Sequence, residues 1–155
     1  MYLQRVLYIF FCLLMLTACM NNQNENSLEP SGNRDLELVK LSSHGTTDQQ
    51  PSNQAKEIIS NYEEISGVRA VNYDNELLIA VEVKHHERFA LDKIESDLRK
   101  KIKQNFSEMK VTLSTDQKIF IELRQLEEDL LANDISEKQL QKRMKKLINL
   151  SKEKT

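Results

Sequence analysis

The chain has 155 residues, a formal net charge of −2 and no tryptophan, and 6% of its residues are aromatic. This length allows one small domain with appendages, and the near-neutral charge gives no indication of nucleic-acid binding. The two cysteines, Cys12 and Cys19, both precede residue 20. A structural disulfide, a cysteine nucleophile and a cysteine-based zinc site are therefore excluded from the rest of the chain.

Residues 1–18 are typical of the signal peptide of a bacterial lipoprotein. Arg5 supplies positive charge, and the apolar run 6–16 is shorter than the roughly 20 residues that a membrane-spanning helix needs. Residues 16–19 read Leu-Thr-Ala-Cys, which fits the lipobox pattern of an aliphatic residue, two small residues and cysteine. We expect Cys19 to carry S-diacylglycerol and N-palmitoyl groups, a stronger anchor than one acyl chain. The alternative is a plain secretory signal with a chance cysteine.

Residues 20–53 are predicted to form a disordered tether, because they are rich in polar side chains and hold both prolines. A flexible chain of this length spans roughly 30–35 Å root-mean-square. The short apolar island at 36–41 is expected to be unstructured. The predicted organisation is a signal peptide at 1–18, lipidated Cys19 with its tether at 19–53, a folded domain at 54–132 and a basic C-terminal helix at 133–155.

The folded domain is predicted to begin with a helix capped by Ser52 and stopped by Gly67. Two strands, 68–73 and 76–84, follow and are joined by a two-residue turn at Asp74-Asn75. Apolar and other residues alternate along the second strand, and we expect the apolar face to point inward and a polar face to point outward. The apolar positions expected to pack are Ala55, Ile58, Ile59 and Tyr62 in the helix and Leu77, Ile79, Val81 and Val83 in the second strand.

A second helix is predicted at 87–106, a third strand at 109–114 and a third helix after a capping box at 114–117. Asn133-Asp134 breaks this helix, and Asp134 is expected to open a fourth one. The predicted apolar stripes are Leu91, Ile94, Leu98, Ile102 and Phe106, then Ile119, Leu123, Leu126 and Leu130, then Leu140, Met144, Leu147 and Ile148.

The predicted fold is therefore α+β, with the order α-β-β-α-β followed by two C-terminal helices. A two-layer sandwich results, in which two helices cover one face of a three-stranded sheet. The two trailing helices are expected either to help cover the small core or to pair with something else.

Four sequence segments resemble the YhcN/YlaJ family of sporulation lipoproteins, and most closely its YlaJ-like branch. They are residues 65–71, the strand at 77–83, the Lys/Arg-rich second helix and residues 111–116. The resemblance covers roughly residues 1–130. The chain lacks the proline that family members often place after the first helix, and its last helix looks like an extension that the family pattern does not specify. We expect the lipid on Cys19 to anchor the protein to the extracytoplasmic face of the cell membrane. The resemblance implies that this is a spore membrane and that the protein has a role in germination or outgrowth. It implies no reaction.

The sequence contains no recognisable catalytic motif. His85 and His86 adjoin Glu82 and Glu87, but neighbouring residues of an extended segment point to opposite sides and do not easily bind one metal ion. Asp and Glu are expected on solvent-facing helix surfaces among Lys and Arg. We therefore expect no enzyme activity, no cofactor and no metal site.

The basic C-terminal helix holds the candidate contact residues Lys142, Arg143, Lys145 and Lys146. One interpretation is that this helix docks on anionic lipid or on an acidic partner. The other is that its apolar stripe packs on its own domain and its lysines face solvent, and the matching stripe of the third helix favours this.

The leading functional hypothesis is a non-enzymatic, membrane-anchored scaffold or interaction domain that influences germination or outgrowth. Its partner is expected to be an envelope or spore protein and not nucleic acid, at an exposed sheet face or edge or at the last helix. The alternative is an oligomeric ring or channel component of the spore envelope, because ring-building domains share the α-β-β-α-β order, an analogy of fold alone.

Overall fold

A computed structural model of the protein describes residues 38–43 and 47–153. Asp35–Thr155 forms one compact unit. Cys19, the signal peptide and most of the predicted tether lie outside the described residues, and no described helix is long and apolar enough to cross a membrane. The elements are α2 (Gln50–Ser60), β1 (Ile65–Tyr73), β2 (Glu76–Val83), the 3-10 helix η2 (His85–Ala90), α3 (Leu91–Asn105), β3 (Lys110–Ser114), α4 (Gln117–Leu131) and α5 (Glu137–Glu153).

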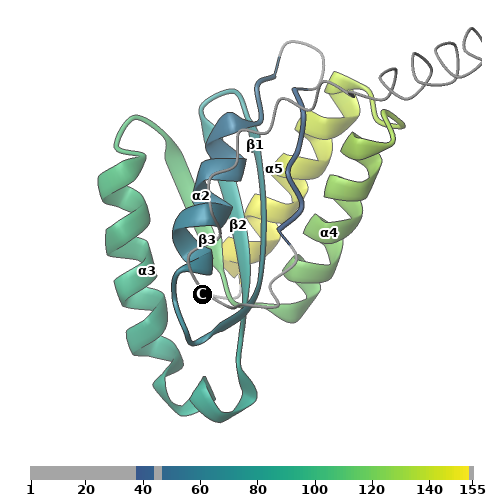
Figure 1. Cartoon of the computed structure of the whole chain (residues 1–155). Coiled ribbons are helices and arrows are strands. Elements are labelled where there is room, and N and C mark those ends of the chain that lie inside the picture. The colour runs from purple at the N-terminus through teal and green to yellow at the C-terminus, as the bar shows by residue number, and fades with distance from the viewer. Residues whose placement is uncertain (1–37, 44–46, 154–155) are drawn as a thin grey trace, which may run out of the picture. The chain divides into compact units, whose positions relative to one another are not determined.

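The three strands form one mixed sheet in the order β1-β2-β3 (Figure 1). Strand β1 is antiparallel to β2, and β2 is parallel to β3. Tyr73 pairs with Glu76 across the predicted two-residue turn, which confirms that turn. Its first residue, Asp74, has a φ of 52°, a backbone conformation that aspartate tolerates better than most residues.

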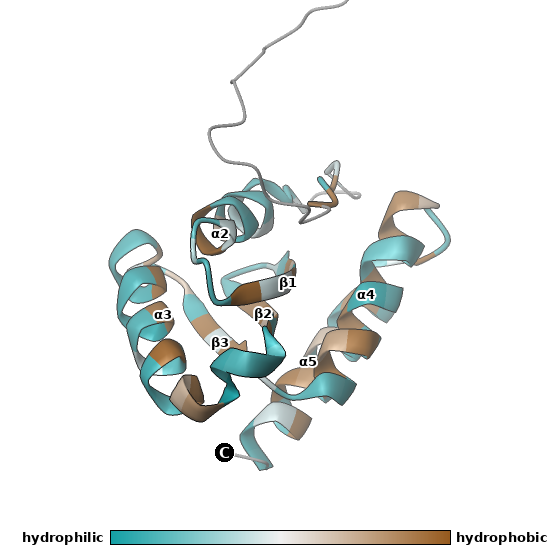
Figure 2. Ribbon diagram, turned by 60° about the horizontal axis from the view of Figure 1, so that its bottom comes forward, coloured by the Kyte–Doolittle hydropathy of each residue, from teal (hydrophilic) through white to brown (hydrophobic). Residues whose placement is uncertain are grey.

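Helices cover both faces of the sheet, so the α+β fold has three layers (Figure 2). Helices α2 and α3 pack on one face, and α4 and α5 pack on the other. Side chains of the central strand β2 contribute to the cores on both faces of the sheet. Leu77 and Ile79 pack in the core with α2 and α3, whereas Leu78 and Ala80 pack in the core with α4 and α5. The α+β class and the predicted helix and strand order are confirmed. The predicted two-layer arrangement with a polar outer face of the sheet is wrong, because α4 and α5 cover that face as a third layer.

The first helix differs from its prediction at both ends. Ser52 lies in its first turn, where the hydroxyl donates to the backbone oxygen of Gln49 at 2.8 Å, so it is not the cap. The helix ends at Ser60, and Gly67 lies within β1. A Cβ atom on Gly67 would lie 2.8 Å from Cζ of Phe120. This glycine therefore permits close approach of α4 to the strand and does not stop a helix.

The C-terminal helices begin with side-chain caps close to the predicted ones. The carboxylate of Asp116 accepts from the backbone N–H groups of Lys118 and Ile119, at 2.9 and 3.1 Å. Helix α5 begins with a reciprocal pair, in which the amide oxygen of Gln139 accepts from the Ser136 backbone at 2.9 Å. Ser136, and not the predicted Asp134, is therefore the residue that opens α5.

The folded domain begins earlier than the predicted boundary at residue 53, because the segment 38–43 docks against it. The backbone N–H of Leu41 donates to Oδ1 of Asn53 at 2.8 Å, and Nδ2 of Asn53 donates back to the Leu41 oxygen at 2.7 Å. The Leu41 side chain is buried in the core under α4 and α5. The expectation that this apolar island is unstructured is therefore wrong for its described part.

Candidate functional site

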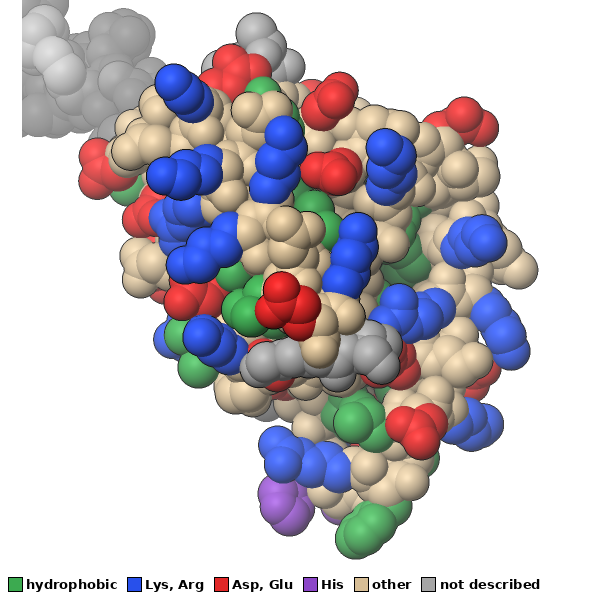
Figure 3. All heavy atoms as spheres, turned by 180° about the vertical axis from the view of Figure 1, so that it is seen from behind, with side chains coloured by type: hydrophobic (Ala, Val, Ile, Leu, Met, Phe, Trp, Pro, Cys, Tyr) green, Lys and Arg blue, Asp and Glu red, His purple; other side chains and the backbone are tan. Residues whose placement is uncertain are grey.

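The four predicted contact residues lie on a helix that packs on its own domain. Leu140, Met144, Leu147 and Ile148 are all buried against the sheet and α4. Because this stripe faces inward, Lys142, Lys145 and Lys146 face solvent and Arg143 is partly exposed. Seen from behind, Lys and Arg side chains lie over much of the surface (Figure 3). The structure therefore agrees with the second interpretation, in which the apolar stripe of α5 packs on its own domain and its lysines face solvent.

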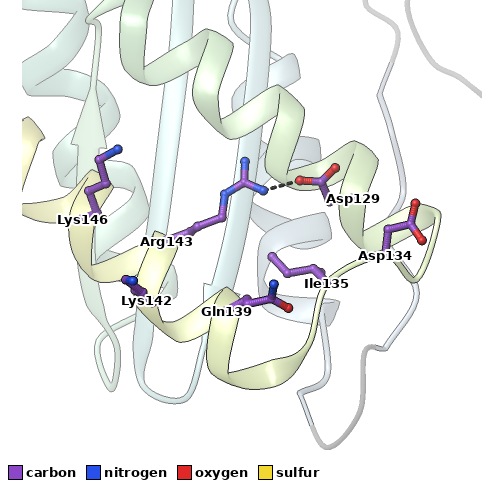
Figure 4. Close-up of a pocket in the computed structure, with 7 residues that line it drawn as sticks. All are labelled: Asp129, Asp134, Ile135, Gln139, Lys142, Arg143 and Lys146. Atoms are coloured by element: carbon purple, nitrogen blue, oxygen red, sulfur yellow. Dashed lines mark hydrogen bonds and ion pairs between the residues drawn. The ribbon is translucent and has the colours of Figure 1, made fainter.

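Three of these cations line a hollow of about 600 Å³ at the turn between α4 and α5 (Figure 4). Arg143 reaches across from α5 and forms an ion pair with Asp129 of α4. Ile135 lies below them and is 5% exposed. The lining residues are Asp129, Asp134, Ile135, Gln139, Lys142, Arg143 and Lys146.

The charge of this hollow favours an anionic group. Asp129 is already paired with Arg143, so Arg143 acts mainly as a link between the two helices. Lys142 and Lys146 are one helical turn apart and share a face of α5. With Asp134 as the remaining acid, the lining keeps a net positive charge. Such a surface can attract a carboxylate, a phosphate or an acidic side chain.

A second group of charges, which sequence reasoning missed, lies inside the domain. Lys56 of α2 and Glu127 of α4 form an ion pair at 3.0 Å, with side chains 2% and 1% exposed. Arg69 of β1 contacts the other oxygen of Glu127 at 3.2 Å. The backbone N–H of Ala70 donates to Glu127 at 3.1 Å, and the Lys56 ammonium donates to the backbone oxygen of Val39. This buried charge cluster joins two helices, a strand and the docked segment.

A family model described as sporulation lipoprotein YhcN/YlaJ matches residues 18–149. The chain belongs to this family. No curated protein and no solved structure matched it. The match begins one residue before Cys19 and continues through most of α5, so the last helix is part of the family pattern and not the extension that the sequence suggested.

Burial dominates the titration of the charge cluster in this YhcN/YlaJ lipoprotein. It raises the pKa of Glu127, against the opposing effects of Lys56, the Ala70 N–H and Arg69. It lowers the pKa of Lys56, an effect opposed by Glu127 and reinforced by the positive charge of Arg69. The Arg69 guanidinium also lies over the Phe120 ring, 5.8 Å from its centre. These residues are linked to one another across α2, β1 and α4, which indicates a structural role.

The lowered pKa of Lys56 predicts a stability that rises with pH in one window. Below its ordinary value of 10.5 the folded protein releases this proton before the unfolded chain does. The unfolded state then binds more protons, so the free energy of unfolding increases as pH approaches 10.5. Urea unfolding at several pH values from 7 to about 10.5 should show this increase in the wild type relative to Lys56→Met. Tyr62, whose raised pKa acts in the opposite direction, is present in both proteins. The raised pKa of Glu127 acts in that direction too, and in Lys56→Met this carboxyl loses the ammonium that lowers its pKa, which widens the difference between the two pH profiles. Parallel pH profiles of the two proteins would contradict the assignment.

The remaining predicted candidates show no convergent site. His85 and His86 are exposed, and Nε2 of His86 lies 3.5 Å from Oε1 of Glu87. Among the described residues, no three His, Cys, Asp or Glu side chains gather in a way that would hold a metal ion. Cys19, the predicted lipidation site, lies outside the described residues.

A sequence signal for the charge cluster did exist. Glu127 is four residues after Leu123 and three before Leu130, so it lies on the apolar face of α4. Lys56 lies directly beside buried Ala55 and three residues before buried Ile59. Charged residues within two apolar stripes indicate buried partners, although only the fold shows that they meet.

Proposed function

We propose that this sporulation lipoprotein is a non-enzymatic interaction domain, held by lipid on Cys19 at the extracytoplasmic face of a spore membrane. There it influences germination or outgrowth by contacting an acidic partner through α5. The observation that carries this proposal is the orientation of α5. Its buried stripe fixes the helix, so Lys142, Lys145 and Lys146 form a rigid, outward basic face.

The anchor would act by confinement. Because residues 38–43 are docked, residues 20–37 are the chain between Cys19 and the folded domain. Even fully extended, they would reach at most about 60–65 Å. A domain confined to such a thin layer has a high effective concentration for any partner at the same membrane. Weak contacts through a small basic face are then sufficient.

A rigid basic face suits an acidic protein or polymer better than insertion into a bilayer. An amphipathic helix that enters a membrane must bury its apolar side in lipid. In α5 that side is occupied by the domain core. The exposed lysines contribute charge and hydrogen-bond donors, and the hollow beside Lys142 and Lys146 offers space for an anionic group.

Complementation of a deletion strain tests this proposal. The strain should form normal numbers of spores that germinate or grow out more slowly, and wild-type protein should restore the rate. Cys19→Ser should abolish lipid labelling and fail to restore it. The triple change of Lys142, Lys145 and Lys146 to Glu should also fail, although the protein stays lipidated and folded.

The matched control reverses three charges elsewhere. Lys100, Lys101 and Lys103 are exposed on α3, and their triple change to Glu alters the net charge by the same amount. This control should restore germination. Normal germination of the deletion strain would contradict the proposed role, and equal behaviour of the two triple variants would contradict the assignment of α5.

A further inference from the structure

One large apolar side chain of the folded domain faces water completely. Phe89 is 102% exposed, whereas the other exposed large apolar residues of the described ranges, Ile121 and Leu131, are 46% and 48% exposed. The transfer of a phenyl ring from water to an apolar environment is favourable in free energy. A ring presented in this way is available for contact with an apolar phase or partner.

The ring projects from a fixed point of the fold. Phe89 lies in η2, which has no buried residue and connects β2 to α3. The backbone of Lys84 donates to the Glu64 oxygen at 2.8 Å, and that of Glu87 donates to the Lys84 oxygen at 2.9 Å. In Figure 1 this segment forms the lower end of the domain, remote from the α4–α5 turn. The η2 tip is therefore a surface distinct from the basic hollow.

The surroundings of the ring suit a lipid headgroup region. Lys84, Arg88 and Lys93 are exposed within five residues of Phe89, against Glu87 and Asp92. Glu64 and Asp97 line the hollow beside Ala90 as well, so the tip combines an aromatic side chain with charges of both signs. Aromatic side chains flanked by cations are favoured at membrane interfaces, where the ring enters the apolar boundary and the cations stay among the headgroups.

We propose that Phe89 inserts into the bilayer that holds the lipid anchor, so that the η2 tip rests on the membrane. A protein partner usually requires about 800 Å² of surface on each side, far more than one ring offers. A bilayer accepts a single side chain, and the anchor of a lipoprotein already holds the domain beside it. This inference rests on the proposed anchoring through Cys19 but not on the role of α5 or on germination.

A tryptophan probe tests the insertion, because the chain contains no tryptophan of its own. The lipidated full-length chain with Phe89→Trp is reconstituted in vesicles of phosphatidylethanolamine and phosphatidylglycerol. Its tryptophan emission should shift to shorter wavelength, and brominated acyl chains should quench it. Acrylamide should quench it several-fold less than it quenches the same probe in the unlipidated Cys19→Ser chain in detergent-free solution.

The matched control places the probe on another exposed apolar position. The same chain with Leu131→Trp carries its tryptophan at the end of α4 and should remain open to acrylamide and insensitive to brominated lipid. Absence of lipid quenching at position 89 in the vesicles would overturn the proposal. Protection of the probe that is seen only in native spore membranes, which contain proteins, would also overturn it. Equal lipid quenching at both positions would also overturn it.

A second measurement keeps the native phenylalanine, because tryptophan itself prefers membrane interfaces. Trypsin cleaves after Arg88, directly before Phe89. In vesicles, cleavage of the lipidated wild type should be slower than that of lipidated Phe89→Ser by about tenfold, the order expected when one phenyl ring loses its apolar environment. In buffer, the two unlipidated chains should be cleaved at similar rates. Equal rates in vesicles would overturn the proposal.

Discussion

Glu127→Ala should lower the free energy of unfolding by about 3–5 kcal/mol, because it leaves the buried Lys56 and the partly buried Arg69 without their carboxylate. Lys56 is 2% exposed and holds Glu127 at 3.0 Å, and Arg69 contacts the same carboxylate at 3.2 Å. The backbone N–H of Ala70 also loses its acceptor. Guanidinium unfolding of the unlipidated chain measures this loss.

The neighbouring residue supplies the control for this change. Glu128 lies on the same helix, is 56% exposed and approaches Arg124 only at 4.0 Å. Its change to Ala should cost at most about 0.5 kcal/mol. Glu127→Gln should give an intermediate loss, because it removes the charge but keeps an acceptor for Ala70. If Glu127→Ala were as mild as Glu128→Ala, the cluster would not be the internal link described above.

The sequence predicted the elements well where one apolar stripe faces one core. Helices α4 and α5 show this, since every position of their predicted stripes is buried. Prediction failed for β2, where alternate residues were taken as the only buried face. The run 77–81 is apolar throughout, which is typical of a strand covered on both sides. That run indicated the third layer, but which helices supply it depends on packing between distant segments.

The candidate site shows the same division between local and distant signals. Clustered Lys and Arg predicted the basic face of α5 without any structure. The pairing of Arg143 with Asp129 depends on how two helices meet at their turn. The contact of Lys56 with Glu127 joins residues 71 positions apart. No local pattern encodes a partner at that distance, so the buried charge cluster became visible only in the fold.

The docking of segment 38–43 on the domain was not predicted, for a related reason. Its sequence is short and its alternation is weak, so its own preference for structure is small. Two hydrogen bonds with the Asn53 side chain, one accepted and one donated by it, and the burial of Leu41 stabilise this segment. Such a segment is ordered by the surface that receives it, and that surface is assembled from elements elsewhere in the chain.

Met144→Ala should lower the free energy of unfolding by about 2–5 kcal/mol, the range for removing a fully buried large side chain. Met144 is 0% exposed and lies in the core between α5, α4 and the sheet. The adjacent Lys145 is exposed, so Lys145→Ala should change stability by at most about 0.5 kcal/mol. Thermal and guanidinium unfolding of both variants measure the difference.

This comparison also separates the two interpretations of α5. A helix that left the domain to enter lipid would need Met144 in the bilayer, so Met144→Ala would weaken vesicle binding of the unlipidated chain and leave its stability unchanged. A helix that forms part of the core gives the reverse result. Because the family match extends into α5 and the buried stripe closes one face of the sheet, we expect the loss of stability. In the proposed function, the basic face keeps its orientation only while the core beneath it is intact.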